Sequence, residues 1–202
     1  MIIKKEDIQN AEQRWRTNLI NSLAGFRTVV LIGTKSLNGN TNLAIFNSLI
    51  HIGANPPLYG FISRPGSVRR DTLKNITETG IYTLNYVKTV DLSNAHQTSA
   101  KYEEDISEFT ETGFTEEYID GFPAPFVKEA VVKFSMQLED KIPIKLNDTL
   151  LVIGSVQSIN LEESLISPDG FVSLEKSNVL LCSGLDAYYS AVFLERLPYA
   201  RP

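Results

Sequence analysis

Residues Thr41 to Arg70, TNLAIFNSLIHIGANPPLYGFISRPGSVRR, decide the fold of this chain. Two runs rich in β-branched and aromatic residues, Ala44 to Ile52 and Leu58 to Ser63, flank the corner Asn55-Pro56-Pro57. Runs of this composition that are separated by proline-rich turns are typical of neighbouring strands. The stretch therefore predicts two strands joined by a tight corner, with small polar residues and arginines at the joints of a sheet.

Polar side chains occur in the middle of the first of these strands. Because successive side chains of a strand point to opposite faces, Asn47 and Ser48 should lie on opposite faces of the expected strand. One of the two is therefore expected to be buried.

Arginines gather where the second strand ends and a helix is expected to begin. Arg64 ends the strand, and Arg69-Arg70 precedes a helix predicted from Asp71 to Thr79. The unpaired amides and the positive dipole end of a helix N-terminus favour an anion, and guanidinium groups add paired hydrogen bonds. Arg64, Arg70 and Thr72 are therefore candidates for a phosphate site. The alternative that stays open is a surface ion pair with Asp71 and a simple N-cap.

The segments on either side continue a β-rich pattern. Within residues 1–25, apolar side chains from Lys5 to Leu23 recur at close to 3.6 residues, which predicts an amphipathic helix packed on the domain. Its acidic polar face disfavours a role at an anionic membrane surface. Further strands are expected at Arg27 to Thr34, Ile81 to Val87, Val131 to Leu138, and Leu150 to Leu161 with a bend at Gly154.

Three other segments are expected outside the sheet. Asp91 to Lys101 is a polar helical stretch, and Tyr102 to Asp120 is an acidic excursion with too few apolar residues to form core. The C-terminal tail, Leu180 to Pro202, carries apolar residues at roughly helical spacing. The excursion is therefore expected to cover another part of the molecule rather than to fill its centre.

The order of these elements predicts one domain, residues 1–202, that is mainly β with helical additions (α+β). Strands follow one another in near succession, and there is no repeated strand–helix–strand rhythm. This order favours an antiparallel barrel over a parallel doubly wound sheet. The G-x-G-x-x-G and P-loop patterns are absent, so any nucleotide must be bound by other means.

Composition excludes several classes of function. With 24 acidic and 19 basic residues, the chain has a net charge of -5, which disfavours binding to nucleic acid. His51 and His96 are the only histidines and Cys182 is the only cysteine, so no metal-ligand cluster of useful spacing exists. No run approaches the roughly 20 apolar residues that span a bilayer, and no signal peptide is recognised. We expect a cytoplasmic protein without a membrane or nucleic-acid partner.

Several segments in a fixed order resemble one known family. NLAIFNSLIHIGANPPLYGFISRP is followed by RDTLKNITETGIYTLNYV, HQTSAKYEEDISEF, LVIGSVQSINL and SGLDAYY. Over roughly Phe26 to Pro202, the chain resembles the flavin reductase-like, FMN-binding split-barrel family, which includes flavoredoxin-like proteins. The resemblance implies a split β-barrel of antiparallel Greek-key type. It also implies a homodimer that binds one FMN per subunit near the subunit interface.

The same resemblance implies a set of cofactor-binding residues. The N-L-A segment would lie against the isoalloxazine ring, the polar residues after it would contact the ring or the ribityl chain, and the arginine-rich joint would hold the phosphate. The loop containing QTSAKY would close over the flavin. In this order the residues are Asn42, Leu43, Ala44 and Ile45; Asn47 and Ser48; Arg64, Arg70, Asp71 and Thr72; and Ser99 and Tyr102. The backbone amides of residues 42–44 would permit close approach of a ring.

One departure from the family pattern bears on activity. Many members that use NAD(P)H carry Gly-Asp-His just before the strand that resembles LVIGSV, whereas this chain has Asn147-Asp148-Thr149. Three functions stay open. The first is an oxidoreductase that passes reducing equivalents from NAD(P)H, as co-substrate, through FMN to free flavin or to another, unidentified acceptor. The second is an FMN-binding electron carrier or sensor without NAD(P)H turnover, and the third is a scaffold that has lost flavin.

Overall fold

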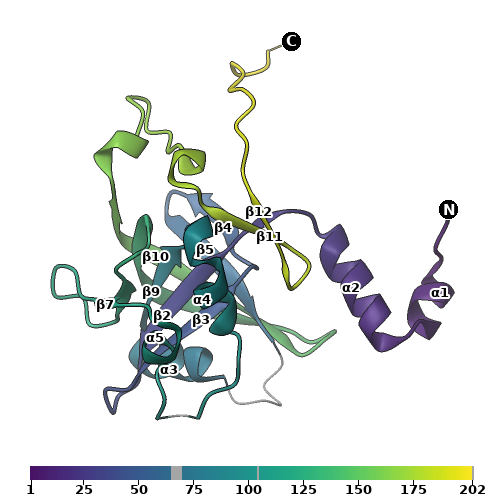
Figure 1. Ribbon diagram of the computed structural model, residues 1–202, viewed down its shortest axis with the longest axis horizontal. Coiled ribbons are helices and arrows are strands. Elements are labelled where there is room, and N and C mark those ends of the chain that lie inside the picture. The colour runs from purple at the N-terminus through teal and green to yellow at the C-terminus, as the bar shows by residue number, and fades with distance from the viewer. Residues whose placement is uncertain (65–69, 104, 202) are drawn as a thin grey trace.

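The computed structural model describes residues 1–64, 70–103 and 105–201 (Figure 1). Over these ranges, seven strands form one antiparallel sheet in the order β3-β2-β6-β9-β10-β5-β4. Its strands are β2 (Val30–Lys35), β3 (Thr41–Phe46), β4 (Ile50–Ala54), β5 (Pro57–Ser63), β6 (Ile81–Tyr86), β9 (Val132–Ile144) and β10 (Thr149–Leu161). The prediction of a mainly β, antiparallel fold is confirmed.

Two smaller sheets and several helices complete the described chain. One small sheet joins β1 (Arg27–Thr28), β11 (Leu180–Ser183) and β12 (Ala187–Ser190), and the other pairs β7 (Glu116–Glu117) with β8 (Phe126–Val127). The α-helices are α1 (Lys5–Asn10), α2 (Gln13–Leu23), α3 (Asp71–Thr79), α4 (Leu92–Gln97) and α5 (Glu108–Thr112), and the 3-10 helices are η1 (Thr89–Asp91), η2 (Glu163–Leu165) and η3 (Leu174–Ser177). Among the residues described, no helix is both long enough and apolar enough to cross a membrane.

The large sheet curls into a barrel that is split between its two edge strands. β3 and β4 lie at opposite ends of the sheet order, yet β3 ends at Phe46 and β4 begins at Ile50. Four residue steps reach at most about 14 Å, whereas a flat sheet would separate the edges by six spacings of about 4.8 Å, or roughly 29 Å. The two edges must therefore approach each other.

The link between β3 and β4 is fastened across the split. The Ser48 hydroxyl accepts a hydrogen bond from the Ile62 N–H at 3.1 Å and lies 3.3 Å from the Ile62 carbonyl oxygen, to which it donates. Asn47 donates from Nδ2 to the Gly184 carbonyl at 2.9 Å, which ties the link to the small sheet. Both side chains are half-buried.

These contacts correct two expectations. The single strand predicted from Ala44 to Ile52 is two strands, and the prediction that either Asn47 or Ser48 would be buried is wrong. The alternating pattern is real on both sides of the link, but the chain leaves one edge of the sheet and enters the other. A period-two pattern cannot distinguish these arrangements, because both halves are strands.

The core has two parts, one on each face of β2. Val30 and Ile32 belong to the cluster inside the barrel, together with Phe61, Tyr82 and Met136. Val29 and Leu31 face a second cluster, which also contains Leu43, Phe109, Phe114, Leu180 and Cys182. The near-continuous apolar run of β2 thus reflects burial on both faces rather than on one.

The acidic excursion contributes to this second core, which its composition had argued against. Phe109, on α5, and Phe114 are 2% and 6% exposed. The Glu108 carboxylate, also buried, accepts a hydrogen bond from the Leu43 N–H at 2.9 Å. Two aromatic side chains and one buried acceptor are enough to fix the excursion against β3, although most of its residues are polar.

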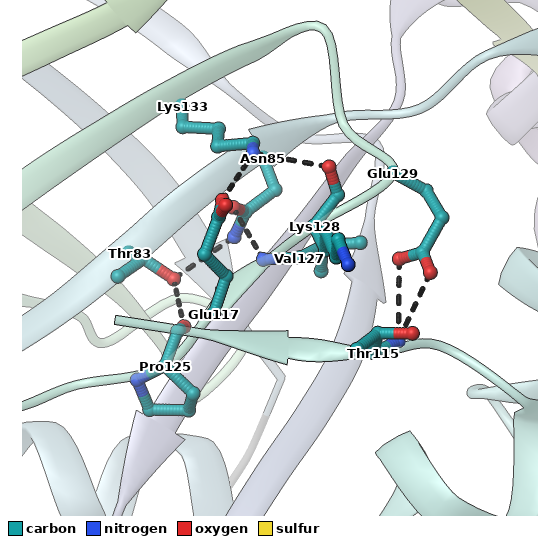
Figure 2. A network of polar contacts seen from close by, with 9 residues as sticks. All are labelled: Thr83, Asn85, Thr115, Glu117, Pro125, Val127, Lys128, Glu129 and Lys133. Carbon is teal, nitrogen blue, oxygen red and sulfur yellow. Dashed lines mark hydrogen bonds and ion pairs between the residues drawn. The ribbon is translucent and has the colours of Figure 1, made fainter. Parts of the chain in front are cut away.

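A network of polar contacts holds the chain after α5 against β6 (Figure 2). Asn85 accepts from the Val127 N–H at 3.0 Å and donates to the Thr83 hydroxyl at 2.9 Å, which in turn donates to the Pro125 carbonyl at 2.7 Å. The buried Lys133 ammonium is paired with the Glu117 carboxylate. Side chains of β6 and β9 therefore supply hydrogen bonds and an ion pair that hold the segment containing β7 and β8 against the barrel.

The strand predicted from Arg27 to Thr34 is divided between β1 of the small sheet and β2 of the large sheet, and the strand predicted from Val131 to Leu138 continues to Ile144 as β9. Other predicted elements agree more closely with the structure. The helix predicted from Asp71 to Thr79 has the same bounds as α3, with Ile76 fully buried and Gly80 in the left-handed region at φ 74°. The bend expected at Gly154 is a register shift between β9 and β10. A Cβ atom at Gly154 would lie 2.2 Å from the Tyr82 hydroxyl oxygen, so the close approach there requires glycine.

The two ends of the chain differ from expectation. The predicted single helix of the N-terminal segment is two helices, α1 and α2, and neither contributes a buried residue. They extend away from the barrel instead of packing on it (Figure 1). The tail has no helix among its described residues: it forms the β11–β12 hairpin and then runs out as an extended segment. Its roughly helical spacing of apolar residues is overridden by pairing with β1.

Candidate functional site

A cavity of about 970 Å³ lies between β3, β5, the start of α3, the segment that follows α4, and the small sheet. Twelve residues were predicted to bind a cofactor, and the structure describes all of them. Eleven line this cavity: Asn42, Ala44, Ile45, Asn47, Ser48, Arg64, Arg70, Asp71, Thr72, Ser99 and Tyr102. The curl of the sheet therefore brings together residues that are up to 60 positions apart in the chain.

Leu43 is the predicted site residue that the structure does not bring to the cavity. Its side chain is fully buried in the second core cluster, on the opposite face of β3 from Asn42 and Ala44. Its backbone N–H donates to the Glu108 carboxylate at 2.9 Å, so this amide already has a partner. Among residues 42–44, the side chains available to a ligand are Asn42 and Ala44.

Arg64 and Arg70 define one end of the cavity, called the cationic end below, and the carboxylates of Asp71, Glu103 and Glu108 also line the cavity. Arg70 is the N-cap residue of α3 and makes no capping hydrogen bond with its side chain. Its Nε atom is buried and has no hydrogen-bond partner among the residues that the structure describes. Arg64, at the end of β5, is exposed and lines the same space. A buried guanidinium donor without an acceptor is costly, which indicates that an anion belongs beside it.

Thr72 and Asn42 connect this end to the barrel. The Asn42 amide donates to the Thr72 hydroxyl at 3.0 Å, and both residues are buried. One turn later on α3, the Asn75 amide donates to the Thr34 hydroxyl at 3.1 Å. The start of α3 is thereby held at a fixed place on β2 and β3, and its first amides face the cavity beside Arg70.

The middle of the cavity has an apolar surface. Ala44, Ile45 and Phe46 come from β3, Phe61 and Ile62 from β5, and Leu73 from α3. Phe46 and Phe61 are in edge-to-face contact with ring centroids 4.9 Å apart. This surface suits a flat apolar group, and Ser48 and Asn47 supply polar atoms at its border.

The opposite wall is formed by the segment after α4, which holds Ser99, Lys101 and Tyr102. Two hydrogen bonds within this segment are local: the Ser99 hydroxyl donates to the His96 carbonyl at 2.7 Å, and Gln97 donates to the Tyr102 hydroxyl at 2.9 Å. Ser99 and Lys101 are exposed and Tyr102 is half-buried. The position agrees with a segment that covers a bound ligand.

Sequence reasoning missed several lining residues at the far end from Arg70. Arg27, His96, Cys182 and Tyr188 all contact the cavity. The Tyr188 hydroxyl lies 2.7 Å from Nδ1 of His96. Burial, followed by electrostatic interactions with Cys182 and Asp186, raises the pKa of Tyr188 to about 12. Tyr188 therefore keeps its proton near neutral pH. His96 and Tyr188 lie in two of the segments that resemble the family, HQTSAKYEEDISEF and SGLDAYY, but no local signal places the four residues together, because β-pairing and loop packing do so.

The segment that departs from the family pattern lies elsewhere. Asn147, Asp148 and Thr149 are at the turn between β9 and β10, where Asp148 has φ 56° and Asn147 Oδ1 accepts from the Thr149 N–H at 3.3 Å. None of the three lines the cavity. The histidine that contacts the cavity in this chain is His96.

The fold and the cavity together define a class of protein: a split antiparallel barrel with an elongated cavity that is cationic at one end and apolar in the middle. The chain belongs to the flavin reductase-like family, since the family profile described as "Flavin reductase like domain" matches residues 25–175. The resemblance to this family, and the split-barrel fold that it implied, are thereby confirmed. Members of this family are flavin-binding oxidoreductases.

Solved structures agree with this assignment. A protein from Shewanella frigidimarina, provisionally named a flavin reductase with a split barrel domain, is 46% identical and superposes with a TM-score of 0.95 over 99% of this chain and 100% of that one. Nitrilotriacetate monooxygenase component B from Bacillus cereus gives a TM-score of 0.85 at 21% identity, covering 98% of both chains. Flavoredoxin of Desulfovibrio vulgaris gives 0.73 at 20% identity, covering 87% of this chain and 92% of that one. The latter two likenesses concern the fold alone.

Proposed function

We propose that the protein binds FMN in this cavity and passes reducing equivalents from NAD(P)H to free flavin or to another acceptor. The observation that carries the proposal is the buried Arg70 Nε atom, which lacks a partner within the described residues at one end of an apolar-lined cavity. A cavity of about 970 Å³ is at the upper end of the roughly 300–1,000 Å³ that cofactor sites occupy. A terminal phosphate group would satisfy the cationic end.

The residues fit the parts of FMN as follows. Arg64, Arg70 and Thr72 would hold the phosphate, together with the first amides of α3. Ala44 and Ile45 would lie against the ring, while Asn47 and Ser48 would supply hydrogen bonds at its polar border or to the ribityl chain. Asp71 also lies at this end, and Ser99 and Tyr102 would cover the cofactor.

The chain supplies binding and orientation, and the cofactor supplies the redox chemistry. When bound, FMN accepts a hydride and returns electrons singly or in pairs. The apolar surface of β3 and β5 would exclude water from one face of the ring, and the cationic end would fix the cofactor along the cavity. No side chain has to act as a nucleophile.

Removing both phosphate-binding guanidiniums tests the assignment. Arg64→Ala combined with Arg70→Ala should weaken FMN binding about a hundredfold, since two charge-assisted contacts are worth on the order of 3 kcal/mol. Fluorescence titration of FMN measures the dissociation constant. Arg16→Ala is a matched control, because Arg16 bonds to backbone carbonyls outside the cavity. Unchanged FMN affinity in the double variant would refute the phosphate assignment.

A second candidate is an FMN-binding electron carrier or sensor without NAD(P)H turnover. The observation in its favour is the turn at residues 147–149, which lacks the histidine of many NAD(P)H-using members and does not line the cavity. Stopped-flow mixing of the FMN-loaded protein with NADH or NADPH separates the two functions. Rapid bleaching of the flavin absorbance supports the enzyme, and indifference to both nucleotides supports the carrier. A colourless protein with no thermal shift in FMN would support the scaffold without flavin.

A cytoplasmic homodimer is also part of the proposal. The N-terminal helices and the tail expose large apolar side chains, among them Trp15, Leu23, Phe193 and Leu194. Exposed apolar surface on extended segments favours a subunit contact. Light scattering coupled to size-exclusion chromatography should give twice the 22.5 kDa chain mass. A monomer at micromolar concentration would contradict the dimer without affecting the cofactor assignment.

A further inference from the structure

The far end of the cavity is built on a single row of the small sheet. Arg27 on β1 is the register partner of Cys182 on β11, and Cys182 is the register partner of Tyr188 on β12. Side chains directly opposite one another on paired strands share a face of the sheet. All three line the cavity. The row therefore places a guanidinium and a phenol on either side of a small thiol, which leaves room between the two longer side chains.

Arg27 is held rigidly and keeps unused donor capacity. Its NH2 group donates to the carbonyls of Asn21 and Gly184 at 3.3 and 3.2 Å. Its Nε atom is buried and has no hydrogen-bond partner in the described chain. Arg27 is half-buried. The guanidinium is thus fixed in position while one of its buried N–H donors still lacks an acceptor, which is the arrangement of an anion-binding arginine.

This arginine is far from the phosphate end. Asn42 is bonded to Thr72 beside Arg70, whereas Asn47 is bonded to Gly184, the residue that also holds Arg27. The two asparagines are five residues apart along β3 and the link after it, or about 16 Å at roughly 3.3 Å per residue. A phosphate bound at Arg70 therefore leaves the Arg27 Nε donor without an acceptor.

The surroundings of Arg27 favour an organic anion over a bare ion. Ile45 and Tyr188 pack against the same core cluster as Cys182 and face the cavity. The rings of Tyr188 and His96 meet edge to face, with centroids 5.6 Å apart. These groups offer an apolar and aromatic surface beside a cation, so a ligand with a carboxylate and a compact apolar body would satisfy both.

We propose that the Arg27–Cys182–Tyr188 row, with Ile45 and His96, forms a second ligand subsite for a small organic acid, whose carboxylate binds to Arg27. The subsite deepens the proposed function, on which it rests: a cofactor anchored at Arg70 would present its ring toward this end, next to the bound acid. Asp186 also lines this end and opposes an anion. Replacing it should therefore strengthen binding.

The test uses benzoate as the probe and benzamide as its neutral counterpart. The protein, with and without FMN, is titrated with each compound by calorimetry, and the FMN-loaded form is also followed through changes in the flavin absorption spectrum. The wild-type protein should bind benzoate saturably and at least tenfold more tightly than benzamide. Arg27→Gln should weaken benzoate binding at least tenfold, because it removes a charge-assisted hydrogen bond, and should change FMN affinity less than threefold.

Arg16→Gln is the matched control. Arg16 also donates to two backbone carbonyls, those of Gln9 and Ala11, but it does not line the cavity. Its benzoate affinity should equal that of the wild type. If Arg27→Gln fails to fold because the Gly184 contact is lost, Asp186→Asn provides an independent readout. Removing that carboxylate should tighten benzoate binding about two- to threefold.

The outcomes are distinct. Equal affinity for benzoate and benzamide, no binding of benzoate to the wild type, or unchanged benzoate affinity in a folded Arg27→Gln variant would overturn the subsite. If Arg27→Gln does not fold, unchanged benzoate affinity in Asp186→Asn would overturn it. Loss of FMN rather than of benzoate in Arg27→Gln would assign Arg27 to the cofactor and also overturn it. Failure of the wild type to bind FMN would contradict the proposed function, whereas benzoate titration of the protein without FMN would still decide the role of Arg27.

Discussion

The two walls of the cavity differ in how they are held: one by long-range strand pairing and buried hydrogen bonds, the other mainly by local contacts. On the barrel wall, Asn42 and Ala44 belong to a strand paired with β2, and the Asn42–Thr72 and Asn75–Thr34 hydrogen bonds behind the cavity are buried. On the other wall, the segment from His96 to Glu103 is mostly exposed. The Ser99 and Gln97 side chains bond within the same segment, and His96 contacts the Tyr188 hydroxyl of the small sheet at 2.7 Å. One wall is a rigid surface set by long-range pairing, and the other is free to adjust to a ligand.

Glu108 joins the two walls. It sits on α5, directly after the adjustable segment, and its carboxylate accepts the Leu43 N–H of the barrel wall at 2.9 Å. The neighbouring Thr41 and Ser107 hydroxyls lie 2.8 Å apart. Because β3 is an edge strand, these side chains take the place of a further strand and cover its free edge. The comparison predicts that variants should lose less stability as they move from the barrel to the adjustable wall.

The largest effect is expected for Gly33→Ala, within the barrel. A Cβ atom at Gly33 would lie 2.2 Å from the Pro125 carbonyl oxygen and 2.6 Å from the Thr83 hydroxyl oxygen. Because the nearer atom is backbone held by the network in Figure 2, relief requires the strand or the loop to move. We expect a loss of about 3 kcal/mol or more in the free energy of unfolding, measured by urea denaturation.

Gly53→Ala, on β4, is the matched control for this substitution. Its added Cβ would contact only the Pro56 carbonyl oxygen, at 3.3 Å. The Pro56 carbonyl would therefore have to shift by a few tenths of an ångström. Its loss should be clearly smaller. Equal losses at the two positions would show that the barrel wall is no more rigid than its edge.

An intermediate effect is expected for Glu108→Ala, where the walls meet. The substitution leaves the buried Leu43 N–H without an acceptor, which should cost about 1–3 kcal/mol of unfolding free energy. Glu108→Gln retains an acceptor oxygen and should recover part of the loss. Glu111→Ala, on the exposed face of the same helix, is the control, and a loss as large as that of Glu108→Ala would contradict the anchoring role.

The smallest effect on stability is expected for Tyr102→Phe, on the adjustable wall. It removes the hydroxyl that accepts from Gln97 at 2.9 Å near the surface. The unfolding free energy should change by less than about 0.5 kcal/mol. If this wall covers FMN, the cofactor should nevertheless dissociate a few-fold faster, as followed by the recovery of free flavin fluorescence. A large drop in stability with an unchanged dissociation rate would place Tyr102 in the structural frame instead.

Local patterns predicted the elements well. The helix from Asp71 to Thr79 was recognised because Leu73 and Ile76 share one face and Gly80 can adopt a positive φ, and all three signals lie within ten residues. The pairing strands β9 and β10 were recognised from alternation and from the glycine at their bend. Arg64 and Arg70 were identified as candidate site residues because arginines beside a helix N-terminus favour binding of an anion.

Contacts between residues far apart in the chain could not be predicted from local patterns. Asn47 and Ser48 were placed in a continuous strand, because nothing in an alternating pattern reveals that the chain passes from one edge of the sheet to the other. Phe109 was assigned to a covering excursion, since a few scattered aromatic residues in a polar stretch do not indicate a core. Arg27 lies fifteen residues before Asn42 and was read only as the start of a strand.

The sequence by itself determined most strands of the large sheet, the helix α3, the family and the arginines beside α3, because periodicity, capping and charge act over a few neighbouring positions. Only the tertiary structure decided which side chains face one another across the cavity. That depends on the curl of the sheet and on the register of β1, β11 and β12, which are set by the packing of distant residues. The placement of Arg27 and Tyr188 on either side of Cys182 follows from that packing alone. The hydrogen bond between Glu108 and the Leu43 N–H has the same origin.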